Sequence, residues 1–100
     1  MEFFAPYMDR IAELCRQHHV ASLHAFGSAA RGSLQPDSDV DLLIDLPMTD
    51  AHEYADSYWA LLDGSESLFN RPVDLLERKN VKNPYRERLI DRDKVALYGA

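Results

Sequence analysis

Two carboxylates, Asp39 and Asp41, stand two residues apart in the segment DVDLLIDL, and they are the clearest chemical signal in the chain. Residues two apart on a strand point to the same face, so these side chains are expected to converge. Adjacent carboxylates repel each other, and a hard divalent cation that prefers oxygen ligands, such as Mg²⁺, relieves that repulsion. The pair therefore predicts a divalent metal site at which phosphate groups complete the coordination shell.

Gly27 and Ser28 form a second candidate element, with ten residues between them and Asp39. They follow the short segment 21–26, which is expected to be a strand. Glycine allows a backbone to approach a ligand closely, and a helix that begins at Ser28 would direct free N–H groups and a hydroxyl at that ligand. Phosphate oxygens match such donors, so residues 27–41 together predict a nucleotide and metal site.

Basic residues near these motifs each have two candidate roles. Arg31 could hold a phosphate of the nucleotide, or it could stabilise the loop around Asp37. A basic stretch near the last predicted helix is either a solvated face or a contact for nucleotide phosphates or a partner. This stretch contains Lys79, Lys82, Arg86 and Arg88.

Asp74 is the candidate third carboxylate, on a neighbouring strand. It lies in the segment 72–76, whose other residues are apolar, and an acid in such a strand is unusual unless it has a partner. The alternative is an edge-strand acid that pairs with Arg71 or Arg78. A third carboxylate would turn the metal site into a catalytic one.

The elements that must position these residues alternate between helices and strands. Apolar residues spaced three and four apart indicate an N-terminal helix, with Pro6 in its first turn. Strands are expected at 21–26, 39–46 and 71–77, and a loop at 32–38, where turn formers gather. The N-terminal stripe comprises Phe4, Tyr7, Met8, Ile11, Leu14, Cys15 and His18.

Two further helices complete this alternation, which predicts an α/β unit. Asp50 is a candidate N-cap, with Glu53 three residues later, and Gly64 is a candidate stop. The last helix is expected to begin at Asn83 and Pro84. The apolar stripes of both helices are assigned to the core, and they comprise Ala51, Tyr54, Ala55, Tyr58 and Leu62 in the first and Tyr85 and Leu89 in the second.

Length and composition set the broad class. The 100 residues predict one small domain, 1–100, and a hydrophobic content of 46% is typical of a globular fold. A net charge of -6 argues against direct binding of nucleic acid. The single cysteine fits a reducing compartment, and neither a signal peptide nor an apolar run of membrane-spanning length is visible. A cytoplasmic protein without membrane contact is expected.

The two-part motif resembles the signature of the DNA polymerase β-like nucleotidyltransferases. The short chain resembles their minimal nucleotidyltransferase (MNT) branch, which includes the MntA-type antitoxins of HEPN/MNT toxin–antitoxin modules. The flanking sequence LHAFGSAARGSLQPDSDVDLLIDL and the segment 93–98 resemble that branch too. The resemblance implies the polymerase β-like fold, an α+β arrangement with a small mixed sheet flanked by helices.

The resemblance also implies a mechanism and a role for each matched residue. Asp39 and Asp41 would bind two Mg²⁺ ions, with Asp74 on one of them and helping to activate the attacking hydroxyl. Gly27 and Ser28 would hold the triphosphate of ATP so that pyrophosphate leaves in line. The acceptor would be a tyrosine hydroxyl of a cognate HEPN ribonuclease toxin, which the added AMP blocks.

Two other functions are weighed against this one. A non-catalytic antitoxin would neutralise the toxin by binding alone, but such a protein has no need for three converging acids. A small-molecule nucleotidyltransferase of the aminoglycoside-modifying type shares the motif, but such enzymes generally carry an extra helical part that the length of this chain does not include.

Overall fold

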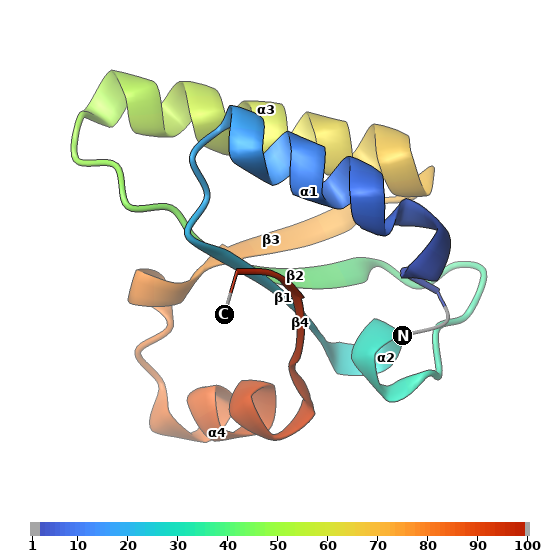
Figure 1. Cartoon of the computed structure of the whole chain (residues 1–100). Coiled ribbons are helices and arrows are strands. Elements are labelled where there is room, and N and C mark those ends of the chain that lie inside the picture. Colours follow the sequence, from blue (N-terminus) through green and yellow to red (C-terminus); the bar gives the residue numbers. More distant parts are fainter. Residues whose placement is uncertain (1–2, 100) are drawn as a thin grey trace.

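A four-stranded mixed sheet forms the centre of the protein, with the strand order β3-β2-β1-β4 (Figure 1). The strands are β1 (Ser22–Phe26), β2 (Val40–Asp45), β3 (Val73–Glu77) and β4 (Val95–Tyr98). β1 runs antiparallel to β2 and to β4, whereas β2 and β3 are parallel. This computed structural model describes residues 3–99, so Met1, Glu2 and Ala100 of the expected domain lie outside the described residues.

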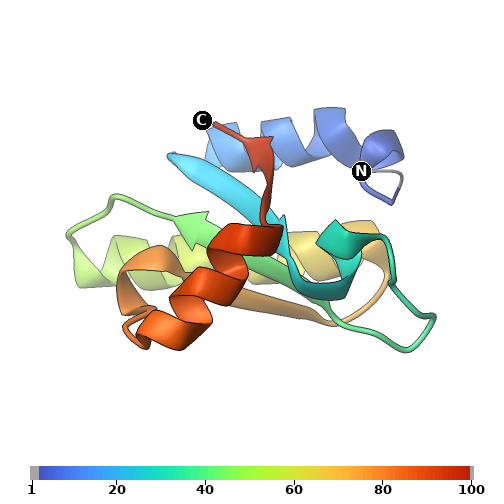
Figure 2. The ribbon, with the colours of Figure 1, turned by 90° about the horizontal axis from the view of Figure 1, so that it is seen from below.

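Helices cover both faces of the sheet. α1 (Met8–Gln17) and α3 (Ala51–Phe69) lie on one face, and α4 (Pro84–Asp93) lies on the opposite face (Figures 1 and 2). The short α2 (Gly27–Arg31) directly follows β1, and two 3-10 turns, η1 (Ala5–Tyr7) and η2 (Arg78–Asn80), precede α1 and follow β3. The structure therefore confirms the predicted α/β class and the small mixed sheet flanked by helices.

The hydrophobic core has two parts because the two faces of the sheet are covered unequally. The larger part lies under α1 and α3 and takes Val40, Leu42 and Ile44 from β2. The smaller part, on the side of α4, consists of Phe26, Leu43 and Ile90. Since Leu43 is buried as well, β2 is covered on both faces, and its polar side is limited to the positions of Asp41 and Asp45.

The predicted stop of α3 at Gly64 is wrong, because the helix continues to Phe69 and ends at Asn70 in the left-handed conformation. A glycine inside a helix costs only about 1 kcal/mol relative to alanine, and burial of Phe69 outweighs that cost. Gly64 instead allows close packing of α1, since a Cβ at this position would lie 3.0 Å from Cδ1 of Leu14.

The predicted core stripe of α3 is confirmed in part, because Tyr54, Tyr58 and Leu62 are partly buried and pack against the core. Ala51 and Ala55 are exposed, and the buried residues follow one another every four positions: Ser57, Leu61, Ser65 and Phe69. Two serines belong to this face, which is why a search for apolar residues alone misplaced it. The predicted N-cap is confirmed, because Oδ1 of Asp50 accepts hydrogen bonds from the N–H groups of His52 (3.0 Å) and Glu53 (2.9 Å).

The end of the chain shows two further differences from the prediction. Asn83 caps α4 as expected, but Tyr85 is 65% exposed and Leu89 37% exposed, so Ile90 is the residue that anchors this helix in the core. Strand β4 was not predicted, since of its four residues only Leu97 is buried and the segment has no clear alternation. Within residues 3–99, no helix combines the length and the apolar character needed to cross a membrane.

Candidate active site

Asp41 occupies the central position of the candidate site. In β2 it is the register partner of Phe26, the last residue of β1, and on its other side it is the partner of Asp74 in the parallel strand β3. The parallel register therefore brings two carboxylates from different parts of the chain side by side on one face. Asp74 is exposed and Asp41 is half-buried.

Asp39 differs from its predicted setting, because β2 begins at Val40 and leaves Asp39 at the end of the preceding loop. Its side chain is exposed. Arg71 orders this loop, since its Nη1 donates hydrogen bonds to the carbonyls of Gln35 (3.0 Å) and Ser38 (3.2 Å). From the sequence, Arg71 was only an alternative partner for Asp74, and its role in the loop was not predicted.

Gly27 allows the Gly27-Ser28 segment to lie directly against the carboxylate of Asp41. Its φ of 66° lies in the left-handed region, which side chains other than glycine rarely adopt. A Cβ at this position would overlap Oδ2 of Asp41 and would lie 3.2 Å from its Cγ. Glycine is thus required twice, once by the backbone turn and once by the carboxylate that lies against it.

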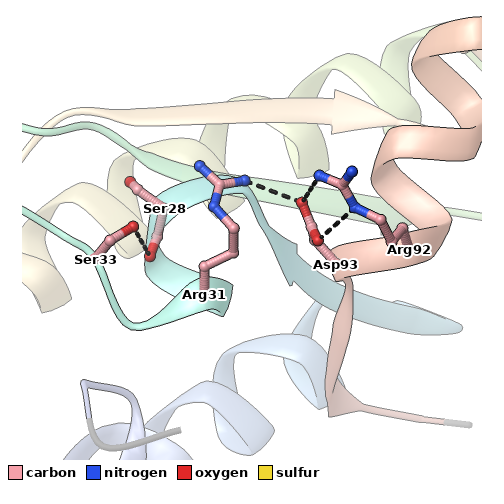
Figure 3. Close-up of polar contacts among 5 residues, drawn as sticks. All are labelled: Ser28, Arg31, Ser33, Arg92 and Asp93. Atoms are coloured by element: carbon pink, nitrogen blue, oxygen red, sulfur yellow. Dashed lines mark hydrogen bonds and ion pairs between the residues drawn. The ribbon is translucent and has the colours of Figure 1, made fainter.

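The helix that follows is short. α2 begins at Gly27, one residue earlier than predicted, and ends after Arg31 at Gly32 with a φ of 77°. The N–H of Ser33 donates to the carbonyl of Ser28 (2.9 Å), and the Ser33 hydroxyl also contacts that carbonyl at 3.5 Å (Figure 3). The hydroxyl of Ser28 makes no hydrogen bond to any other residue of the described range 3–99, so it is available for a ligand.

Arg31 is held by the far end of the chain and not by the loop around Asp37. Its Nη1 donates to Oδ2 of Asp93 at 3.0 Å, and Arg92 binds both oxygens of the same carboxylate at 3.0 and 3.1 Å (Figure 3). These hydrogen bonds, that from Arg92 first, hold the pKa of Asp93 below its usual range. Asp93 was not predicted as a site residue, because only tertiary structure brings it to Arg31.

The electrostatics of Asp41 agree with a site built for a cation. Burial raises the pKa of Asp41, and the charges of Asp74 and Asp39 raise it further, while Arg86 and Arg31 oppose the rise. Carboxylate oxygens that repel each other are the ligands Mg²⁺ prefers, so the donor set fits this ion. As the side chains lie, no three His, Cys, Asp or Glu residues in 3–99 are already arranged around a common metal position.

A shallow cleft opens beside Asp41, between the end of β1, α2 and α4. It is lined by Phe26, Gly27, Arg31, Asp41, Arg86, Leu89, Ile90 and Asp93. Four of these residues come from α4, and of the four only Arg86, in the basic stretch, was a predicted candidate for contact with phosphates or a partner. The alternative role considered for Asp74 is not observed, since among the described residues Asp74 forms no ion pair with Arg71 or Arg78.

Comparison with known proteins places the chain in a family. The model of the nucleotidyltransferase domain matches residues 8–97. A relative from Methanocaldococcus jannaschii, "Putative protein adenylyltransferase MJ1379", is 29% identical over 86% of this chain and 93% of its own length. The residues that the family model matches, 8–97, include all six predicted site residues: Gly27, Ser28, Arg31, Asp39, Asp41 and Asp74.

Solved structures share the fold. A chain described as a "putative minimal nucleotidyltransferase" is 26% identical, with a TM-score of 0.69 over 94% of this chain and 92% of that one. A toxin–antitoxin structure with AMP-PNP matches with 20% identity and a TM-score of 0.72, over 93% of this chain and 73% of that one. A structure of a tri-AMPylated Shewanella oneidensis HEPN toxin in complex with MNT antitoxin matches with 18% identity and a TM-score of 0.65, over 95% of this chain and 71% of that one. Since the family model spans nearly the whole sequence, the chain belongs to the nucleotidyltransferase domain family.

Proposed function

We propose that this nucleotidyltransferase is an antitoxin that transfers AMP from ATP to a tyrosine hydroxyl of a cognate HEPN ribonuclease toxin. The observation that carries the proposal is the position of Asp41, which lies between Gly27, the first residue after β1, and Asp74 on β3. A nucleotidyl transfer needs carboxylates for metal and a backbone turn that admits phosphate at the same place. Both requirements meet at Asp41.

The metal requirement is assigned to the three carboxylates. Asp39, Asp41 and Asp74 would hold two Mg²⁺ ions, which supply Lewis-acid stabilisation of the charge on the α-phosphate. Gly27 and Ser28 would hold the triphosphate, the glycine through its close backbone approach and the serine through its hydroxyl. Arg31, kept in place by Asp93, would add a positive charge at the rim of the cleft.

The transfer itself is a displacement at phosphorus. The acceptor oxygen forms a bond to the α-phosphorus while the bond from that phosphorus to the bridging oxygen breaks, and pyrophosphate leaves with the electron pair. The hydroxyl proton goes to a base, for which Asp74 is assigned because it is exposed beside Asp41. The products are a phosphodiester on the acceptor and pyrophosphate.

A protein acceptor is supported by two of the comparisons. The M. jannaschii relative is named as a protein adenylyltransferase, and the Shewanella structure contains an AMPylated HEPN toxin together with an MNT antitoxin. The cleft beside Asp41 is shallow and open, which suits an acceptor that brings its own surface more than a small molecule that must be enclosed. ATP and Mg²⁺ would come from the cytoplasm.

The proposal is tested by co-expression with the HEPN-type ribonuclease that it names as the cognate toxin. Mass spectrometry of the purified ribonuclease should find one or more added AMP groups on a tyrosine, and Asp41→Ala should remove them. Asp45→Ala is the matched control, since Asp45 lies on the same strand but pairs with Ser22 at its far end. An inhibited ribonuclease without any AMP would show a binding antitoxin instead. AMP found only on aminoglycoside-like small molecules would identify the other alternative.

A further inference from the structure

One arginine of the cleft has no anionic partner among the side chains of residues 3–99. Of the two arginines that line the cleft, Arg31 is paired with Asp93 at 3.0 Å. The guanidinium of Arg86, in contrast, makes no ion pair and no side-chain hydrogen bond with any residue of the described range 3–99. An arginine that faces a carboxylate site without pairing is unusual, because its planar fork readily forms bidentate contacts with carboxylates.

The position of Arg86 is set by the packing of α4. The side chain of Asn83 caps the first turn of this helix, and Ile90 anchors it against Phe26 and Leu43. Arg86 and Ile90 are four residues apart and therefore lie on the same side of the helix. That side faces the sheet beside Asp41, so the arginine lines the cleft although it is exposed to solvent.

Arg86 also reaches toward the second carboxylate strand. Besides the cleft at Asp41, it lines a neighbouring hollow together with Leu76. Leu76 is two residues beyond Asp74 in β3, so it lies on the same face of the sheet. The arginine thus lies on the side of the sheet on which Asp41 and Asp74 are register partners.

We infer that Arg86 binds the polyphosphate of the nucleoside triphosphate and thereby acts as a further ligand-contacting residue of this cleft. The inference rests on the nucleotide site of the proposed function and adds to it a residue from α4. Guanidinium groups bind phosphate oxygens through two parallel N–H donors. An anion between Arg86 and the cations expected at the carboxylates would relieve the repulsion between these positive groups.

The alternative is that Arg86 serves only as a counter-charge for the carboxylates. It does oppose the rise in the pKa of Asp41 that burial and the charges of Asp74 and Asp39 cause. A counter-charge of this kind would form an ion pair with one of them, but the structure contains none for Arg86 within residues 3–99. The geometry therefore favours a ligand that lies between the arginine and the acids.

The test measures binding of AMP-PNP and of AMP by calorimetry, in the presence of Mg²⁺, for the full chain. Arg86→Gln should weaken AMP-PNP binding about ten- to a hundredfold, the range for a lost charge-assisted hydrogen bond, and should leave AMP binding nearly unchanged. Arg86→Lys should restore part of the loss, since it restores the charge but not the fork. Arg88→Gln is the matched control, because Arg88 is exposed on the same helix and does not line the cleft.

Equal binding of AMP-PNP by the native protein and by Arg86→Gln would overturn the inference, as would an equal loss for AMP and AMP-PNP. Failure to bind any triphosphate in the native protein would overturn it as well. A different result would contradict the proposed function. If the protein bound AMP-PNP through Arg86 but transferred no AMP to the ribonuclease, the proposed function would be wrong and the inference about Arg86 would still hold. Unfolding temperatures of all variants exclude misfolding as the cause.

Discussion

Gly27 and the carboxylate of Asp41 touch, although Gly27 begins α2 and Asp41 lies in β2, on the other side of the loop that follows α2. A Cβ at Gly27 would overlap Oδ2 of Asp41. The left-handed φ of Gly27 turns the chain directly out of β1 into α2 at this contact. The two halves of the nucleotidyltransferase motif are therefore joined physically, and a change in one displaces the other.

Gly27→Ala is expected to reduce AMP transfer at least about tenfold and to destabilise the fold by about 1–3 kcal/mol, because it combines backbone strain with displacement of Asp41. Gly32→Ala is the matched control. Gly32 also has a left-handed φ of 77°, but nothing lies within 4 Å of a Cβ built there. Urea unfolding and transfer assays of both variants check this. Equal effects of the two substitutions on transfer would show that strain alone matters.

Asp41→Asn should lower transfer by about a hundredfold or more, since it removes a metal-binding charge. It should at the same time raise the unfolding temperature near neutral pH without added metal. The pKa of Asp41 is raised in the folded protein, by burial first and then by Asp74 and Asp39. A raised pKa means that the stability present below the unfolded pKa is lost as pH rises through the folded value.

The raised pKa of Asp41 also predicts how the stability of Asp41→Asn, relative to the native protein, depends on pH and Mg²⁺. The excess stability of Asp41→Asn over the native protein should shrink as pH falls through the raised pKa of folded Asp41. It should vanish below the pKa of an ordinary aspartate, about 3.9, because Asp41 is then neutral in both states. Mg²⁺ should stabilise the native protein more than the variant. Thermal unfolding across pH, with and without Mg²⁺, measures both effects. A variant less stable than the native protein at neutral pH would contradict the role given to charge repulsion.

Arg71→Gln should loosen the loop that ends at Asp39, since it removes the hydrogen bonds to the carbonyls of Gln35 and Ser38. The expected cost is about 1–2 kcal/mol of stability, with a higher Mg²⁺ concentration needed for half-maximal transfer. Arg10→Gln is a suitable control. Arg71 also lies over the ring of Phe3 at 5.1 Å, and Arg10 lies over that of Tyr7 at 5.2 Å, so the control removes a similar cation–π contact. If both variants changed the Mg²⁺ requirement equally, the role of the loop contacts would be disproved.

Cys15 should react with iodoacetamide about a hundredfold more slowly in the folded protein than in concentrated urea at a pH of about 8. The thiol is 1% exposed, and burial raises its pKa to about 11, so the reactive thiolate is scarce. Alkylation rates followed by mass spectrometry measure this. Similar rates in both conditions would mean that α1 opens readily from α3.

The elements near the motif could be predicted because local signals are strong there. Strand β2 alternates apolar and acidic residues, Asp50 and Asn83 are good N-caps, and Gly27 interrupts the chain at a turn. The elements that were missed or misplaced lack such signals. The buried face of α3 contains Ser57 and Ser65, and β4 forms because it pairs with β1, not because of its own pattern.

The sequence by itself determined which residues can do the chemistry, because carboxylates two apart on a strand and a glycine at a turn have few other uses in this arrangement. It also determined the class of the fold through the alternation of helices and strands. Only the tertiary structure decided which residues are neighbours in space. It places Asp74 beside Asp41, pairs Asp93 with Arg31, and brings Arg86 to the cleft beside Asp41. These pairings join segments far apart in the chain through sheet register and helix docking, and neither leaves a periodic trace in the local sequence.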